Sequence, residues 1–180
     1  LRSRIIPCLL LRNRGLVKTV QFGNPKYVGD PLNAVRIFNE KEVDELIVLD
    51  IDATVGKREP DYALIRNLAA ECRMPLCYGG GVQTELQAER IISMGVEKVA
   101  LSAAAAADTS IVQRLSNSLG RQSVVVVVDV RRNKKGGYEI YTHNGTRIVP
   151  RLLLDYIREV KHMGAGEIVI NSIDNDGLMK

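Results

Sequence analysis

Short apolar runs alternate along this chain with longer amphipathic stretches. The most extreme run lies in residues 123–132, SVVVVVDVRR, where five consecutive valines precede the carboxylate of Asp129. A β-branched run without polar alternation predicts a strand buried on both faces, as in a parallel sheet covered by helices. The residues that close such a strand lie at its C-terminal end, where parallel α/β folds bind ligands. Asp129 is therefore the first candidate for chemistry.

Five more apolar runs predict further strands, at residues 4–11, 45–50, 75–78, 98–102 and 167–172. Between them, capping residues and amphipathic periodicity predict helices over 31–38, 61–71, 84–92, 103–119 and 152–163. The polar, glycine-containing stretch 12–30 has little periodicity and predicts a long lid or binding loop. The Asn144-Gly145 pair predicts the turn of a β-hairpin.

Regular alternation of strand and helix predicts a βα-repeat architecture. We expect one α/β domain over residues 1–180, a TIM (β/α)8 barrel with about six of its eight βα units present. A doubly wound sheet is the alternative; the barrel is favoured because polar residues follow every strand rather than one switch point. Six units would leave the first and last strands with unpaired edges, which indicates a fragment or an edge supplied by a partner.

Composition narrows the function classes. The chain has 180 residues, 46% hydrophobic and 4% aromatic, no Trp, and a net charge of +4 with Lys and Arg scattered among acids. These features count against nucleic acid as a partner, and no apolar run approaches the roughly 20 residues that span a membrane. Three cysteines without metal-ligand spacing (Cys8, Cys72 and Cys77) predict buried free thiols in a reducing cytoplasm.

No cofactor or metal site is predicted. The chain contains no GxSxG, Walker, CxxC or HExxH pattern. His143 falls in a turn and His162 on a helix, so neither is expected to be a metal ligand or a catalytic base.

A glycine triplet, Gly79-Gly80-Gly81, lies between a predicted strand and a predicted helix. Backbone N–H groups exposed beside a helix N-terminus favour a phosphate site, and the alternative is a plain tight turn. Ser102 and Ala103, at the next strand exit, could complete the same cradle.

Several carboxylates are expected at the C-terminal ends of the strands. Asp129 is the candidate general acid or base, and its alternative roles are a helix cap or an ion pair with Arg131 or Arg132. Other members of this active-site rim, some of which should cap the following helices, are Asp50, Asp52, Asp174, Asp176 and Gly177.

The opposite ends of the strands carry a second set of charges. Four charged residues open predicted strands, namely Arg4, Glu45, Lys98 and Glu167. If they converge on a barrel axis they would form a mutually neutralising ring, because unpaired buried charges are costly. The alternative is four separate surface charges.

Six segments, taken in order, resemble the cyclase subunit of imidazole glycerol phosphate synthase: RIIPCLLL, LIVLDIDAT, YGGGV, EKVALS, VVVVVDVRR and INSIDNDG. The resemblance covers the whole chain and ends where the seventh and eighth βα units of that family would begin. It implies a (β/α)8 barrel that forms a heterodimer with a glutaminase subunit docked on its N-terminal face. Ammonia would pass through the barrel to a phosphorylated substrate at the C-terminal face, and amination, ring closure and cleavage would follow.

The resemblance also implies roles for individual residues. Asp129 matches the second of two catalytic aspartates, and Lys18 matches a loop lysine that helps to enclose the substrate. Gly79 to Gly81 match one phosphate site, and Glu97 matches an acidic residue that faces the glutaminase. The four strand-opening charges match the gate at the ammonia entrance.

Three departures from the family pattern fall near the C-terminal ends of the strands, where the resemblance places the substrate. Leu10 stands where the family has its first catalytic aspartate, and a leucine cannot transfer a proton. Arg12-Asn13-Arg14 replaces a Lys-Asp-Gly turn, and Ser102-Ala103 replaces an Asn-Thr pair. The stretch CLLLRNRGLVKTV is similar to a paralogous branch that serves acetamidino modification of surface sugars, where the pair provides ammonia to a separate amidotransferase acting on a nucleotide-linked sugar.

Three functions follow from these observations. The leading hypothesis is a synthase subunit that receives ammonia from a glutaminase and delivers it toward a phosphorylated or nucleotide-sugar substrate. The first alternative is a competent cyclase of histidine biosynthesis, a lyase. The second alternative is a non-catalytic scaffold that docks a glutaminase.

Overall fold

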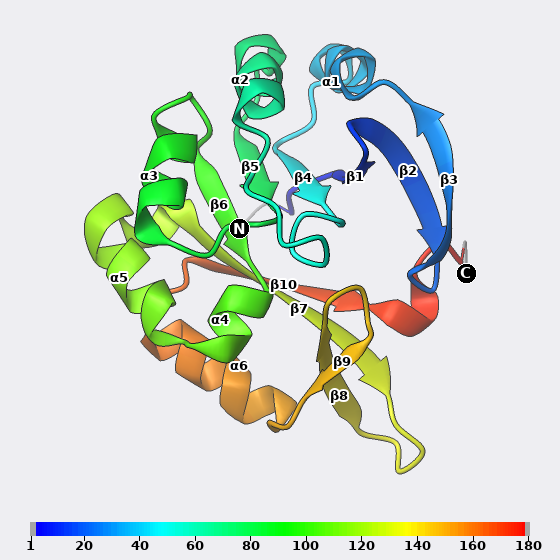
Figure 1. The fold of residues 1–180 in the computed structure, drawn as a ribbon, viewed down its shortest axis with the longest axis vertical. Helices are drawn as coiled ribbons and strands as arrows, with labels where there is room; N and C mark the ends of the chain where they lie inside the picture. Colours follow the sequence, from blue (N-terminus) through cyan, green and yellow to red (C-terminus); the bar gives the residue numbers. More distant parts are fainter. Residues whose placement is uncertain (1–2, 179–180) are drawn as a thin grey trace. The chain divides into compact units, whose positions relative to one another are not determined.

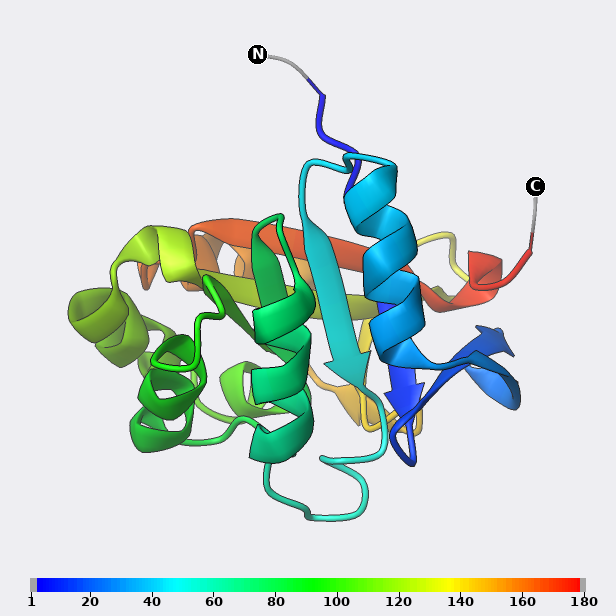
Figure 2. The same ribbon diagram turned by 90° about the horizontal axis from the view of Figure 1, so that it is seen from above.

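The computed structural model describes residues 3–178 (Figures 1 and 2). The chain forms two compact units. The first comprises the described part of 1–18 together with 26–99, and the second comprises 19–25 and 100–178.

The first unit is built on three parallel strands. They are β1 (Cys8–Arg12), β4 (Leu46–Asp50) and β5 (Leu76–Gly79). Cys8 lies opposite Ile47 in the β1–β4 pair, and Ile47 lies opposite Cys77 in the β4–β5 pair. Leu46, Val48 and Cys77 are completely buried, as expected for strands covered on both faces.

A hairpin follows β1 in the chain. Its strands are β2 (Gly15–Val20), which pairs antiparallel with β1, and β3 (Gly23–Gly29). The helices of this unit are α1 (Pro31–Glu40), α2 (Tyr62–Glu71) and α3 (Glu85–Ile92). Figure 1 shows α1 and α2 side by side against these strands.

The helix starts follow the predicted capping signals. Asp30, Asp61 and Thr84 each accept a backbone N–H three residues ahead, at 3.0, 3.1 and 3.3 Å. Thr84 and Gln87 form a reciprocal capping box. The side chains therefore satisfy N–H groups that a free helix end would leave unpaired.

The second unit is built on β7 (Val124–Arg132) and β10 (Glu167–Ser172), which run parallel with Asn171 opposite Asp129. The end of β7 also pairs antiparallel with β8 (Tyr138–Thr142). Strand β8 in turn pairs antiparallel with β9 (Arg147–Val149). The helical segments of this unit are α4 (Ala103–Ala107), α5 (Ser110–Leu119), η1 (Arg121–Ser123), α6 (Leu153–His162) and η2 (Ile173–Asn175). Strand β6 (Lys98–Leu101) begins in the first unit and ends in the second.

The predicted α/β class is confirmed. Strands and helices alternate in the predicted order, and the pairs β1–β4, β4–β5 and β7–β10 are parallel. Over the described residues, the element order is that of five successive βα units followed by a sixth strand, β10, as in a partial TIM barrel. Within residues 3–178, no helix has the length and apolar character needed to cross a bilayer.

Three predictions from the sequence were wrong: the start of the first strand, the long loop after it, and the burial of the cysteines. The first strand begins at Cys8 rather than Arg4, although the Pro7 carbonyl still accepts a hydrogen bond from Ile47. Residues 15–29 form the β2–β3 hairpin rather than an irregular loop, and its tip residues Gln21 and Phe22 have positive φ angles of 52° and 64°. Such turns normally carry Asn or Gly, so the residues at this tip do not predict a hairpin turn. Cys8 is exposed and Cys72 half-buried, and of the three thiols only Cys77 is buried as predicted.

Candidate functional site

The C-terminal end of β7 brings Asp129 between two strands. The five preceding valines are buried, so the carboxylate lies at the point where the strand leaves the core. On one side, Asn171 of β10 donates a hydrogen bond from Nδ2 to Asp129 Oδ1 at 3.2 Å. On the other side, Tyr141 of β8 lies opposite Asp129 in the antiparallel register.

The environment of Asp129 favours its protonated form. The pKa of Asp129 is raised to about 6, mainly by burial; the Asn171 hydrogen bond opposes this rise and the charge of Asp176 adds to it. A carboxyl group with a pKa near the working pH can both accept and donate a proton. This perturbed group at a strand exit is therefore a candidate for acid–base chemistry.

The two arginines that follow Asp129 form no ion pair with it among the described residues. The Arg131 guanidinium lies over the Tyr141 ring, 4.8 Å from its centroid. The backbone N–H of Arg132 donates to Asp174 Oδ2 at 2.7 Å. The predicted alternative of an Asp129–arginine ion pair is therefore not found in the part of the chain that the structure describes.

The other rim carboxylates serve the loops that follow the strands. In the first unit, Asp50 Oδ1 accepts the backbone N–H groups of Asp52 and Ala53, both at 3.0 Å. Burial raises the pKa of Asp50, and the Asp52 carboxylate pairs with Arg12 at 2.9 Å. In the second unit, Asp174 binds the backbone of β7 as described, and Asp176 binds the tip of the β2–β3 hairpin.

Position 10, near the end of β1, is a leucine and therefore has no titratable side chain. Leu10 lies opposite Leu49 of β4 and Val17 of β2, so its neighbours in the sheet are apolar. Lys18 is exposed on β2, at the boundary of the first unit.

Close backbone packing requires two of the three glycines of the triplet, Gly80 and Gly81. Gly80 and Gly81 have φ angles of +113° and +73°, which L side chains rarely adopt. A Cβ on Gly80 would lie 2.4 Å from the Asp50 carbonyl oxygen, and one on Gly81 would lie 2.7 Å from the Arg58 carbonyl oxygen. These contacts support the tight-turn alternative directly, and the phosphate role stays a prediction. Ser102 and Ala103 belong to the second unit, at the start of α4.

Three of the four predicted gate charges meet in the first unit. Glu45 is 2% exposed, and its Oε2 accepts hydrogen bonds from Arg4 Nη1 at 2.9 Å and Lys98 Nζ at 2.7 Å. Its other oxygen, Oε1, is buried without a hydrogen-bond partner. Glu167, the fourth charge, opens β10 in the second unit. Glu97 is exposed, and its Oε2 accepts the Leu76 backbone N–H at 2.7 Å.

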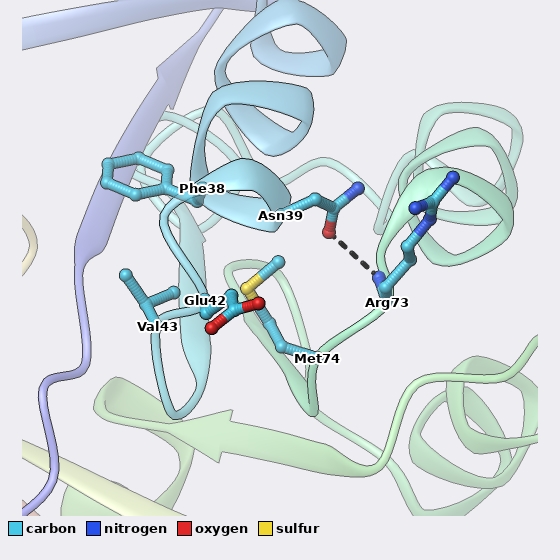
Figure 3. A pocket seen from close by; sticks show the side chains of 6 residues that line it. All are labelled: Phe38, Asn39, Glu42, Val43, Arg73 and Met74. Atoms are coloured by element: carbon cyan, nitrogen blue, oxygen red, sulfur yellow. Dashed lines mark hydrogen bonds between the residues drawn. The ribbon is translucent and has the colours of Figure 1, made fainter.

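A hollow of about 260 Å³ lies beside the C-terminal end of α1 (Figure 3). Asn39 bridges its rim, because Oδ1 accepts the Arg73 backbone N–H at 3.0 Å while Nδ2 donates to the Glu71 carbonyl at 2.9 Å. No residue of this hollow was predicted as a site residue, and its sequence carries no motif. Its lining residues are Phe38, Asn39, Glu42, Val43, Arg73 and Met74.

Sequence reasoning missed two partners of the rim carboxylates. Asn171 was read only as part of a strand, although a polar residue near the end of a parallel strand could have drawn attention to it. Thr19 is 5% exposed and donates its hydroxyl to Asp176 at 2.6 Å. A buried threonine in a polar segment gives no sequence signal by itself.

Comparison with known proteins places these features in a family. A family model described as "Histidine biosynthesis protein" matches residues 4–180. The chain is 55% identical over 179 residues to the "Putative imidazole glycerol phosphate synthase subunit hisF2" of Pseudomonas aeruginosa, covering 99% of the chain and 71% of that protein. It is 55% identical over 181 residues to the "Putative imidazole glycerol phosphate synthase subunit hisF3" of Vibrio vulnificus, covering 100% and 70%. It is also 37% identical over 177 residues to the imidazole glycerol phosphate synthase subunit HisF of Streptomyces coelicolor, covering 98% and 70%.

Proposed function

The chain belongs to the histidine biosynthesis protein family, and on that premise we propose that it is the cyclase-type subunit of a glutamine-dependent synthase. The observation that carries the proposal is the Asp129 carboxyl, held at the exit of β7 by Asn171 with its pKa raised to about 6. Such a group can exchange protons near neutral pH, which amination and ring closure both require.

In the proposed reaction, Asp129 moves the protons. Attack of ammonia on an electrophilic carbon leaves an extra proton on nitrogen, which the Asp129 carboxylate takes up. Ring closure with cleavage then needs a proton on the departing group, which the same carboxyl returns. In the first unit, Gly79 to Gly81 would bind a substrate phosphate through backbone N–H groups. In the second unit, Ser102 and Ala103 would offer a hydroxyl and a backbone N–H to a phosphate. Lys18 would help to enclose the substrate.

Ammonia would enter from a glutaminase bound at the opposite ends of the strands. The buried Glu45 carboxylate accepts hydrogen bonds from Arg4 and Lys98, which supports a gate at the start of β4. Glu167 would be the fourth member of this gate. Glu97 would face the glutaminase. Because such a system draws on glutamine, we expect the pair to work in the cytoplasm.

The nature of the nitrogen acceptor separates two versions of this function. The names of the relatives support formation of imidazole glycerol phosphate. The apolar setting of Leu10 favours a second candidate, in which ammonia is passed to a separate amidotransferase that acts on a nucleotide-linked sugar. A docking scaffold without chemistry is the third candidate.

The decisive experiment combines the protein with its glutaminase, glutamine and the open-chain phosphoribulosyl formimino substrate, and measures imidazole glycerol phosphate. We expect product at a rate about 10²–10⁴-fold below that of a cyclase with both aspartates, because one acid–base group is missing. Leu10→Asp should raise that rate and Asp129→Asn should abolish it. Asp155→Asn, an exposed aspartate on α6, is the matched control and should leave it unchanged.

Ammonium salt in place of glutamine separates the gate from the chemistry. Lys98→Glu should impair the glutamine-driven reaction more than the ammonium-driven one. If neither nitrogen source gives product while glutamine is still hydrolysed, the protein is not a cyclase. The two remaining candidates are then transfer of ammonia to another acceptor and the docking scaffold. An unimpaired glutamine-driven reaction in Lys98→Glu would refute the gate.

A further inference from the structure

The tip of the β2–β3 hairpin is bound to the loop that leaves β10. Asp176 Oδ2 accepts two hydrogen bonds from this tip, one from Thr19 Oγ1 at 2.6 Å and one from the Phe22 backbone N–H at 2.9 Å. The Asp176 carbonyl accepts a third, from the Gln21 backbone N–H at 3.0 Å. One residue of the exit loop therefore satisfies three donors of the tip.

Three further contacts involve the same tip. The Gln21 side chain donates to the Asp174 carbonyl at 3.0 Å. Gly177 packs so closely that a Cβ there would lie 2.1 Å from the Thr19 carbonyl oxygen, and its φ is +68°. The Phe22 ring lies 3.4 Å from the position of a Cβ on Gly145, in the β8–β9 turn.

The backbone of the tip needs such support. Gln21 and Phe22 adopt left-handed conformations, which are uncommon for side chains other than Gly, Asn and Asp. Strained residues of this kind persist where the surrounding structure determines them. Thr19 is 5% exposed, so its bond to Asp176 is shielded from competing water.

We propose that Thr19 and Asp176 are positioning residues that form a latch: they fix residues 19–25 on the exit of β10, beside the Asp129–Asn171 pair. Asp176 then accepts hydrogen bonds from the protein's own donors rather than from substrate. Its negative charge stays at a fixed place near Asp129, where it contributes to the raised pKa of that carboxyl. The latch itself does not depend on the proposed reaction; only its effect on turnover does.

Amide hydrogen exchange tests the latch without any assay of activity. Thr19→Val keeps the shape and removes the hydroxyl, and it should speed exchange of the Gln21 and Phe22 amides by roughly 10- to 100-fold, the loss expected for a hydrogen bond to a charged group. Thr19→Ser restores the donor and should match the parent protein. Asn175→Ala, in the same exit loop without a bond to the tip, should also match it. Unchanged exchange in Thr19→Val would overturn the latch.

A second variant and a kinetic assay separate the latch from a general change in the fold and from the proposed function. If Thr19→Val also accelerates exchange in β7, Thr19→Ala replaces it, because alanine places no methyl group against the carboxylate. In the synthase assay, Thr19→Val should raise KM more than it lowers kcat, with rescue by Thr19→Ser. A normal KM together with faster exchange would remove the link to the proposed function and leave the latch standing. Normal exchange would refute the latch whatever the kinetics.

Discussion

Replacing Asp129 with asparagine tests the energetic environment of the candidate site. The pKa of this carboxyl is raised from 3.8 to about 6, and each pKa unit corresponds to about 1.4 kcal/mol. The ionised form therefore costs the folded protein up to about 3 kcal/mol relative to the unfolded chain. Asparagine keeps an oxygen that can accept the Asn171 hydrogen bond and removes the charge that burial disfavours.

The pH dependence has a definite sign. Because the folded pKa lies above the unfolded one, the folded state holds this proton more tightly between pH 4 and pH 6. The free energy of unfolding of the parent protein thus loses this contribution as the pH rises through 6. Asp129→Asn lacks the titration, so the difference between variant and parent should shift in favour of the variant by about 2–3 kcal/mol from pH 4 to pH 8.

Urea unfolding followed by circular dichroism at pH 4, 5, 6, 7 and 8 measures that difference. Contributions from the carboxylates that do not interact with Asp129 are common to both proteins and cancel. Asp155→Asn is the matched control, because this side chain is 65% exposed and pairs only with Arg158 among the described contacts, so its effect should stay within about 0.5 kcal/mol at every pH. A stability difference for Asp129→Asn that does not change with pH would refute the raised pKa and the acid–base argument built on it.

Two further predictions use the same unfolding assay. Lys98→Met should cost about 3 kcal/mol, because it removes a cation from the buried Glu45, whereas Arg4→Met should cost about 1 kcal/mol since that side chain is 47% exposed. Equal costs would contradict this account of the cluster. Gly80→Ala should cost about 3 kcal/mol or more through backbone strain and its clash in the β4–α2 region, and Gly136→Ala, strained but in open space, about 1 kcal/mol. A Gly80→Ala protein as stable as Gly136→Ala would refute the close packing.

Features set by neighbouring residues were predictable from the sequence. The valine run forms the buried part of β7, because β-branched side chains favour the strand conformation wherever both faces are covered. The starts of α1 and α3 were predictable because Asp30 and Thr84 cap N–H groups only three residues away. Asp129 was found for the same reason, since its position at the end of the run is a local property.

Features set by distant residues were not predictable. Thr19 and Asp176 are 157 positions apart, and Asn171 and Asp129 are 42 apart. Their pairing depends on the register of β10 on β7 and on a hairpin tip whose Gln-Phe sequence is unusual for left-handed residues. The exposure of Cys8 has the same origin, because an apolar local sequence does not show how much of a strand its neighbours cover.

The energetics of the strand ends argue for the proposed division of roles. Ionised Asp129 lowers the stability of the fold, and an asparagine could keep its one hydrogen bond without that cost. A destabilising buried carboxyl at a strand exit is expected where chemistry requires it, because local rules are broken mainly at functional sites. Leu10 shows the reverse, since an apolar side chain between Leu49 and Val17 favours packing and can move no proton. We therefore propose that Asp129 alone transfers protons, and on that proposal Leu10→Asp is expected to raise the rate of cyclisation while Asp129→Asn abolishes it.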